Sequence, residues 1–108
     1  MQQKEGWNTV SIRPGKLDRS PCGTGTSARL ALMKQKNEID INEIFISRSI
    51  IGSTFEAKIK EEFISNNKQM IKPLIKGSAF ITGKQELYIS KDDPFPEGYR
   101  LNDTWPDF

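Results

Sequence analysis

The chain of 108 residues carries 16 basic and 14 acidic side chains, for a net charge of +2, and 35% of its residues are hydrophobic. The two signs of charge are interspersed, which is typical of a solvated surface and excludes a basic nucleic-acid-binding stripe. No apolar run approaches the roughly 18–20 residues of a membrane span, and the polar first residues do not resemble a secretory signal. We therefore expect neither nucleic acid nor a membrane as partner.

The chain contains one cysteine and no histidine. A single cysteine forms no internal disulfide, so we expect a protein of the reducing cytoplasm. Without histidine, a transition-metal site would depend on carboxylates, and the sequence holds no suitable cluster of them. We therefore expect no metal, and the length predicts one domain with a small core.

The first third of the chain predicts strand, turn, strand and helix. Residues 7–12 alternate apolar and polar side chains, as in a strand, and Pro14 with Gly15 predicts a turn after it. Residues 16–18 are expected to form a short second strand. Residues 26–36 predict a helix that is apolar on nearly every face, which is typical of a buried helix, and Asn37 predicts its end.

The middle of the chain favours β-structure. Strands are expected at residues 43–51, 55–60, 70–75, 79–82 and 86–90. Asn66 and Asn67 predict a turn, and Pro73, which lacks an N–H, predicts an edge or irregular strand. Residues 92–108 are rich in proline and predict an irregular tail, which Tyr99, Leu101 and Trp105 are expected to hold down.

The single cysteine lies in residues 18–29, which read Asp-Arg-Ser-Pro-Cys-Gly-Thr-Gly-Thr-Ser-Ala-Arg. Cys22 stands just before a Gly/Thr-rich turn that opens the expected helix. A helix start exposes unpaired N–H groups and the positive end of the helix dipole, which favour a thiolate. Gly23 and Gly25 remove side chains beside the sulfur, so that amide groups can approach an anion closely.

Three phosphate-binding alternatives fit this segment poorly. A P-loop requires a lysine that is absent here. The dinucleotide-binding fingerprint requires a hydrophobic strand directly before its glycines, and residues 18–21 are not one. In a cysteine-phosphatase loop, the spacing between the cysteine and the arginine is one residue shorter than the spacing between Cys22 and Arg29. A structural alternative stays open, because a free cysteine is often simply a small buried side chain; Thr26 and Arg29 are interpreted as a helix cap and a surface charge.

Residues 18–29 resemble the second cysteine motif of the proline racemase family, which includes 4-hydroxyproline 2-epimerase and trans-3-hydroxyproline dehydratase. Three later segments extend the similarity, at residues 48–53 (Arg-Ser-Ile-Ile-Gly-Ser), 77–83 (Gly-Ser-Ala-Phe-Ile-Thr-Gly) and 93–99 (Asp-Pro-Phe-Pro-Glu-Gly-Tyr). Residues 99–106 look most like the hydroxyproline epimerase branch. The similarity thus runs through nearly the whole chain.

The resemblance implies an α/β (α+β) fold of the diaminopimelate epimerase type. Such proteins have two similar halves, each with mixed or antiparallel strands wrapped around a central helix, and an active site between the halves. Because family members are much longer, we expect residues 1–108 to be a C-terminal half-domain with the irregular tail at 92–108. The other half, with the first catalytic cysteine in a Cys-Gly-His motif, would be missing or supplied by another chain; a homo-oligomer is a further expectation.

The resemblance also implies an isomerase that needs no cofactor and acts at the α-carbon of 4-hydroxyproline or proline. Two cysteines remove and return the α-proton on opposite faces of the amino acid. Cys22 matches the second of these cysteines, Gly23 and Thr24 match the backbone donors to the substrate carboxylate, and Asp18 matches the residue that binds the ring nitrogen. A turn-forming or capping role is the structural alternative for Asp18.

One base cannot perform a two-base exchange, so we expect the chain alone to be inactive. The dehydratases carry threonine in place of the second cysteine, so Cys22 favours a racemase or epimerase over a dehydratase-related protein. The remaining alternative is a non-catalytic half-domain that binds a carboxylate or pairs with a separate half.

Overall fold

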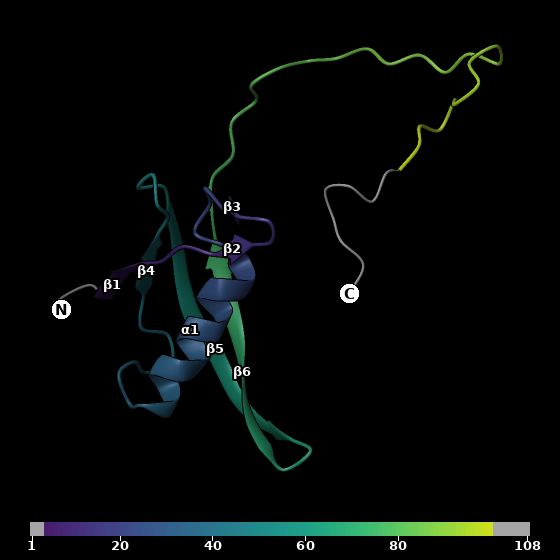
Figure 1. Cartoon of the computed structure of the whole chain (residues 1–108). Coiled ribbons are helices and arrows are strands. Elements are labelled where there is room, and N and C mark those ends of the chain that lie inside the picture. Colours follow the sequence, from purple (N-terminus) through teal and green to yellow (C-terminus); the bar gives the residue numbers. More distant parts are fainter. Residues whose placement is uncertain (1–3, 101–108) are drawn as a thin grey trace. The chain divides into compact units, whose positions relative to one another are not determined.

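A mixed four-stranded sheet, with strand order β1-β4-β5-β6, supports one helix in the computed structural model, which describes residues 4–100 (Figure 1). The strands are β1 (Lys4–Trp7), β4 (Phe45–Arg48), β5 (Thr54–Ser65) and β6 (Lys68–Lys76), and the helix is α1 (Gly23–Gln35). β1 pairs with β4 in parallel, whereas β4–β5 and β5–β6 are antiparallel. Two short strands, β2 (Ser11–Ile12) and β3 (Lys16–Leu17), form a separate antiparallel hairpin.

The chain divides into two compact units, Met1–Ser78 and Ala79–Phe108. The first unit contains every helix and strand found between residues 4 and 100. No helix in that described range is long and apolar enough to cross a membrane.

Local sequence signals fix the turns of the first unit. Gly15 donates its N–H to Ile12 O at 2.8 Å across the predicted turn between β2 and β3. Asn66 and Asn67 both adopt positive φ, 51° and 61°, between β5 and β6. Two successive positive φ values are those of a type I′ hairpin turn, in which asparagine is favoured. These predicted turns are confirmed.

The end of α1 is also where the sequence places it. Asn37 adopts φ 59°, its N–H donates to Lys34 O at 3.0 Å, and Glu38 N–H donates to Met33 O at 2.8 Å. This pair of hydrogen bonds is the Schellman motif, which satisfies the last carbonyls of a helix and requires a residue that tolerates positive φ. Asparagine is one of the few residues other than glycine that does so.

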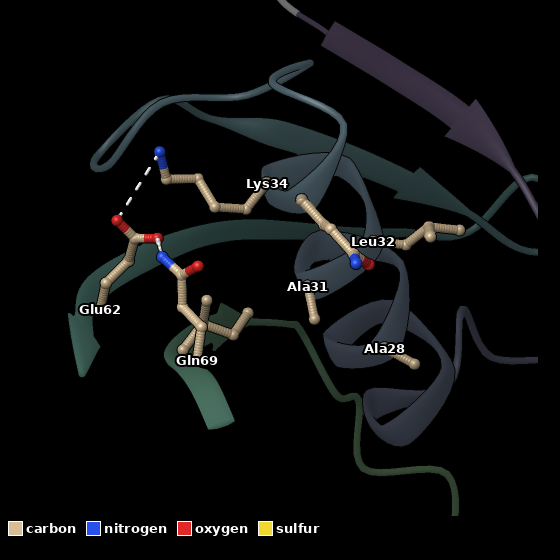
Figure 2. Close-up of a pocket in the computed structure, with 8 residues that line it drawn as sticks. Ala28, Ala31, Leu32, Lys34, Glu62 and Gln69 are labelled. Atoms are coloured by element: carbon tan, nitrogen blue, oxygen red, sulfur yellow. Dashed lines mark hydrogen bonds and ion pairs between the residues drawn. The ribbon is translucent and has the colours of Figure 1, made fainter. Parts of the chain in front are cut away.

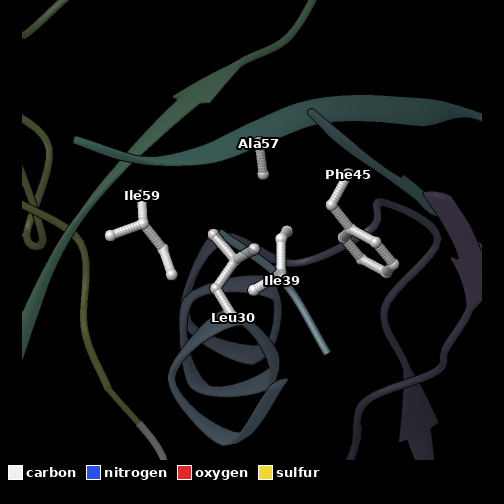
Figure 3. Close-up of a cluster of buried hydrophobic side chains, with 5 residues drawn as sticks. All are labelled: Leu30, Ile39, Phe45, Ala57 and Ile59. Carbon is white, nitrogen blue, oxygen red and sulfur yellow. The ribbon is translucent and has the colours of Figure 1, made fainter. Parts of the chain in front are cut away.

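The hydrophobic core lies between α1 and one face of the sheet. Figure 3 shows its five buried side chains converging: Leu30 from α1, Ile39 from the following loop, Phe45 from β4, and Ala57 and Ile59 from β5. Removing a large aliphatic or aromatic side chain of this kind from water contributes about 1.5–3 kcal/mol. Met33, Ile71 and Ile75 pack against the cluster and extend it toward β6.

Pro73 lies on β6, which is an edge strand, as predicted. It stands opposite Ile59, and the register shifts between Ile59 and Glu61 directly beside it. A proline has no N–H for the ladder, so it is tolerated where one side of the strand is free or where the pairing is irregular.

Several predicted elements are wrong in extent. The strand expected at residues 7–12 is divided, because β1 ends at Trp7 and β2 begins at Ser11. The strand expected at 43–51 is confined to Phe45–Arg48, and a turn follows it. Helix α1 begins at Gly23 rather than at residue 26, because Cys22 caps it.

The prediction that α1 is buried on nearly every face is wrong. Only Thr26 and Leu30 are buried in it, whereas Ala28 and Ala31 are exposed and Leu32 is 49% exposed. In the first unit the sheet packs against one side of the helix, through β5 and β6. The apolar residues on the other side therefore have no cover there.

The strands expected at residues 79–82 and 86–90 are wrong: between residues 77 and 100 the chain forms no helix or strand. Strand formation requires a neighbouring backbone to complete the hydrogen bonds, and the described part of the second unit offers none. The apolar side chains of these segments are 81–97% exposed: Phe80, Ile81, Leu87, Tyr88 and Ile89.

The tail from residue 92 onward is irregular as far as residue 100. Tyr99 packs edge-on against Phe95, with 5.3 Å between the ring centroids. Leu101 and Trp105, which were expected to hold the tail down, lie outside the described residues.

Candidate functional site

Cys22 is the N-cap of α1. Its Sγ accepts the N–H of Gly25 at 3.3 Å, and its carbonyl oxygen accepts the N–H of Thr26 at 3.0 Å. The thiol is free and half-buried. Gly23 and Thr24, the first two helical residues, are exposed, and no group in the described part of the chain accepts their N–H. The sulfur therefore lies beside two amide donors that are open to an anion, at the positive end of the helix dipole.

Gly25 leaves room for the Val10 side chain next to the start of α1. A Cβ at Gly25 would lie 3.0 Å from Val10 Cγ2 and 3.6 Å from Cys22 Sγ. The first distance is shorter than ordinary van der Waals contact, so a larger residue would press on Val10 beside the sulfur. This close approach accounts for glycine at this position.

The backbone of Cys22 is strained, with φ 64° and ψ 120°. A non-glycine residue in such a region costs about 1–3 kcal/mol and persists only where its surroundings hold it. Here the carbonyl oxygen of Pro21, just before the cysteine, accepts hydrogen bonds from Asn8 Nδ2 at 3.0 Å and from Thr26 Oγ1 at 3.1 Å. Ser47 Oγ donates to Asn8 Oδ1 at 2.8 Å and lies 3.0 Å from Thr26 Oγ1.

Thr26 and Ser47 are both fully buried. Thr26 is thus not the helix cap that the sequence suggested; it lies one turn inside α1 and joins the helix to β4. Buried hydroxyls are tolerated when they are hydrogen-bonded, as these are. With Asn8, which follows β1, they form a polar network beneath the Cys22 loop.

Asp18 lies on the same loop and forms an Asx turn. Its Oδ1 accepts the N–H of Ser20 at 2.8 Å and the Ser20 hydroxyl at 2.7 Å. These hydrogen bonds to the Ser20 side chain and backbone lower the pKa of Asp18 below its ordinary value of 3.8, with a smaller contribution from the Cys22 side chain. Ser20 Oγ in turn accepts the N–H of Cys22 at 3.1 Å. Asp18 is therefore held as a carboxylate and linked to the cysteine through one serine.

The turn after β4 supports the loop from another side. Ser49 N–H donates to Ser53 O at 2.9 Å, and the two hydroxyl oxygens lie 2.6 Å apart. Ser53 Oγ donates to Arg19 O at 3.3 Å. Residues 48–53, one of the segments that the sequence analysis singled out, thus contact the cysteine loop directly.

Arg29 is more than the surface charge that the sequence suggested. Its Nη1 donates to Trp7 O at 3.1 Å, and its guanidinium lies over the ring of Phe45, 5.1 Å from the centroid. A Cβ at Gly6 would lie 2.4 Å from Arg29 Nη2. The guanidinium therefore occupies the space above Gly6 and joins α1 to β1.

A hollow also lies away from the cysteine loop. A pocket of about 400 Å³ lies between the exposed face of α1 and the far ends of β5 and β6 (Figure 2). Lys34 Nζ lies 3.7 Å from Glu62 Oε1 at its rim, and Gln69 donates to the other carboxylate oxygen at 2.7 Å. No predicted site residue lines this pocket. Among residues 4–100, no three His, Cys, Asp or Glu side chains gather as a metal site.

The structure brings Asp18, Cys22, Gly23 and Thr24 together on one loop and helix start, as their proximity in sequence requires. The sequence analysis missed the supporting residues Asn8, Ser47 and Ser53 and underrated Thr26. The amide side chain of Asn8 and the hydroxyl of Ser47 lie 39 residues apart in the chain, and no local sequence pattern marks such a pair. Only a polar residue inside an apolar strand, Ser47 after Phe45 and Ile46, gave a signal.

Comparisons with known proteins agree with the motif. The proline racemase family model matches residues 1–100. A crystal structure of a probable proline racemase from Agrobacterium radiobacter K84, with bound carbonate, is 38% identical, has a TM-score of 0.73, and is matched over 92% of this chain and 29% of that chain. A hydroxyproline epimerase from Agrobacterium vitis, with bound trans-4-hydroxy-L-proline, is 34% identical, with a TM-score of 0.74 over 92% of this chain and 28% of that chain.

The present chain therefore spans less than a third of either neighbour. The resemblance found in residues 18–29 and the mixed α/β fold class are both confirmed, because the structural neighbours are proline racemase and epimerase folds. With the family match extending over residues 1–100, the chain belongs to the proline racemase family.

Proposed function

We propose that this chain is a portion of an amino-acid racemase or epimerase in which Cys22 moves the α-proton of 4-hydroxyproline or proline without a cofactor. The observation that carries the proposal is the position of Cys22 at the N-terminus of α1, with the open N–H groups of Gly23 and Thr24 beside it. The solved neighbours, named as a probable proline racemase and a hydroxyproline epimerase, support this choice of substrate class.

The proposed chemistry is proton transfer at the carbon next to the carboxylate. The Cys22 thiolate forms an S–H bond as the Cα–H bond breaks, and the electron pair passes into the carboxylate. The N–H groups of Gly23 and Thr24 would bind that carboxylate and stabilise the charge that accumulates on it. Asp18 would accept the ring N–H through its Oδ2. Both hydrogen bonds from Ser20 go to the other carboxylate oxygen, Oδ1.

Inversion requires a second base on the opposite face, and this chain has one cysteine. We propose that the remaining portion comes from a partner, either a separate half or a second copy. Two apolar surfaces support a partner: the open face of α1, with Ala28, Ala31 and Leu32, and the exposed side chains of residues 80–89. The cytoplasm stays a prediction for the compartment.

Amide NMR of the 108-residue chain tests the binding half of this proposal. Pyrrole-2-carboxylate, a planar mimic of the flattened α-carbon, should shift the amide resonances of Gly23, Thr24 and Gly25. Neutral pyrrole-2-carboxamide is the matched control and should shift them much less, because the N–H groups would bind the anionic carboxylate. Equal shifts with the two ligands, or none with either, would contradict carboxylate binding.

Deuterium exchange tests the chemistry. In D₂O the chain should exchange the α-proton of one 4-hydroxyproline epimer with retention of configuration, and Cys22→Ser should abolish the exchange. Mass spectrometry measures the uptake, and chiral chromatography measures the inversion. Exchange that survives in Cys22→Ser would refute the assigned role of Cys22, and inverted product from the purified wild-type chain would refute a separate half as the necessary source of the second base. Binding without exchange would instead favour the non-catalytic carboxylate-binding half-domain.

A further inference from the structure

Two peptide planes set the direction of the Cys22 side chain, and Thr26 contacts both. Its Oγ1 donates to Pro21 O at 3.1 Å, which fixes the plane before the cysteine. Its N–H donates to Cys22 O at 3.0 Å, which fixes the plane after it. The torsion angles between these planes are the φ of 64° and ψ of 120° that aim Sγ at the Gly25 amide.

The Thr26 hydroxyl is itself oriented by a second layer. Ser47 Oγ lies 3.0 Å from it and donates to Asn8 Oδ1 at 2.8 Å, and Asn8 Nδ2 returns to the same Pro21 carbonyl at 3.0 Å. Ser47 gives its only hydroxyl proton to Asn8, so the single Thr26 hydroxyl proton is shared between two acceptors, Pro21 O and Ser47 Oγ, and the contacts link four residues. Because one carbonyl oxygen receives two donors, the peptide plane before Cys22 has little freedom to rotate.

The chemistry of this site is unusual for a core position. Thr26 and Ser47 have no exposed surface, and Pro21, whose carbonyl Thr26 contacts, is buried as well. Valine and alanine would fill such positions without the cost of burying hydroxyl groups. The hydroxyls are therefore best explained by what they hold in place rather than by core packing.

We propose that Thr26, oriented by Ser47 and Asn8, is a positioning residue that holds Cys22 in its positive-φ conformation and so aims the sulfur at the helix N-terminus. The significance of this geometry for catalysis rests on the proposed function. The geometry itself is independent of any ligand, so it can be tested separately.

The test compares the full chain with Thr26→Val, which removes the hydroxyl and keeps the shape, and Thr26→Ser, which keeps the hydroxyl. The intraresidue amide–Hα NOE of Cys22 reports φ directly, because these protons are closest at positive φ. The rate of Cys22 alkylation by iodoacetamide reports the placement of the sulfur. Thermal unfolding, recorded in parallel, separates a change in the loop from a general loss of stability.

Thr26→Val should weaken the Cys22 NOE, reduce protection of the Gly25 amide against hydrogen exchange, and change the alkylation rate. Loss of one hydrogen bond predicts a decrease of about fivefold in the population of the positive-φ conformation of Cys22 relative to all other conformations of the loop. Thr26→Ser should restore all three values. Wild-type values in Thr26→Val, or loss of the NOE in Thr26→Ser as well, would overturn the proposal.

Asn8→Asp provides a second route if Thr26→Val does not fold. Asn8 is only half-buried, and aspartate keeps the acceptor for Ser47 while it removes the donor to Pro21 O. It should weaken the Cys22 NOE in the same direction, and an unchanged NOE would count against the network. Failure of pyrrole-2-carboxylate to bind the wild-type chain would refute the proposed function and leave these comparisons valid.

Discussion

The contact between Gly6 and Arg29 yields a quantitative prediction about how α1 is joined to the sheet. In Gly6→Ala the new Cβ would lie 2.4 Å from Arg29 Nη2 and 2.7 Å from Cζ. Both distances are far below van der Waals contact, so the guanidinium must move away. It would then lose its hydrogen bond to Trp7 O at 3.1 Å and its place over the Phe45 ring at 5.1 Å.

The expected cost follows from these two contacts. A hydrogen bond from a charged donor contributes about 1.5–3 kcal/mol, and a cation–π contact near the surface about 0.5–1 kcal/mol. Alanine in a strand recovers about 0.5–1 kcal/mol relative to glycine through backbone entropy. Arg29 is half-exposed, so the lower values apply. Gly6→Ala should therefore destabilise the chain by about 1–1.5 kcal/mol.

Urea unfolding, followed by circular dichroism, measures this cost, and the Arg29→Ala background provides the control. Without the guanidinium the space above Gly6 is empty, so the same Gly6→Ala change should become neutral or stabilising by up to about 1 kcal/mol. An equal cost in both backgrounds would show that Gly6 is required for another reason. No cost in either background would refute the contact between α1 and β1.

Two further predictions concern the core and the loop. Leu30→Ala should destabilise the chain by about 2.7–5 kcal/mol, because Leu30 is fully buried, whereas Leu32→Ala, at a position 49% exposed, should cost less than about 1 kcal/mol. Similar urea midpoints for these two variants would contradict the one-sided packing of α1. Because the folded-state pKa of Asp18 is lowered from 3.8, its carboxylate contributes stability above that pH and loses the contribution as the pH falls through the lower folded value. Asp18→Asn should flatten the acid limb of a stability-against-pH profile, and an unchanged limb would exclude this linkage.

The parts of the fold that the sequence predicted depend on short-range chemistry. Asn37 ends α1 and Asn66–Asn67 forms a hairpin turn because a positive φ is a property of one or two residues. The motif of residues 18–29 was equally accessible, because Asp18 and Cys22 lie close in sequence and share one loop. In these cases neighbouring residues carry most of the information.

The errors arise where the structure depends on distant partners. Residues 79–82 and 86–90 have the composition of strands, but a strand forms only against another backbone, and composition does not reveal whether one is present. The apolar residues on nearly every face of α1 likewise predict burial on every side, but the strands of this chain cover only one side of the helix. Cysteine is also not among the common N-cap residues, so the helix start was placed three residues too late.

The two ends of α1 therefore differ in how the rest of the chain supports them. At its N-terminus, the carbonyls of Arg19 and Pro21 are held by side chains from the turns and strands of this chain, Ser53 on one side and Asn8 with Thr26 on the other. Toward its C-terminus, the helix forms one wall of the pocket shown in Figure 2, and Glu62, Gln69 and Ile71 of β5 and β6 form the other, while Leu32 is 49% exposed. A partner that covers this face would add mainly to stability, because burial of Leu32 and its neighbours does not involve the cysteine loop. The hydrogen bonds that hold the Cys22 loop thus come from residues of this chain, and the proposed partner would supply the second base on the opposite face of the substrate.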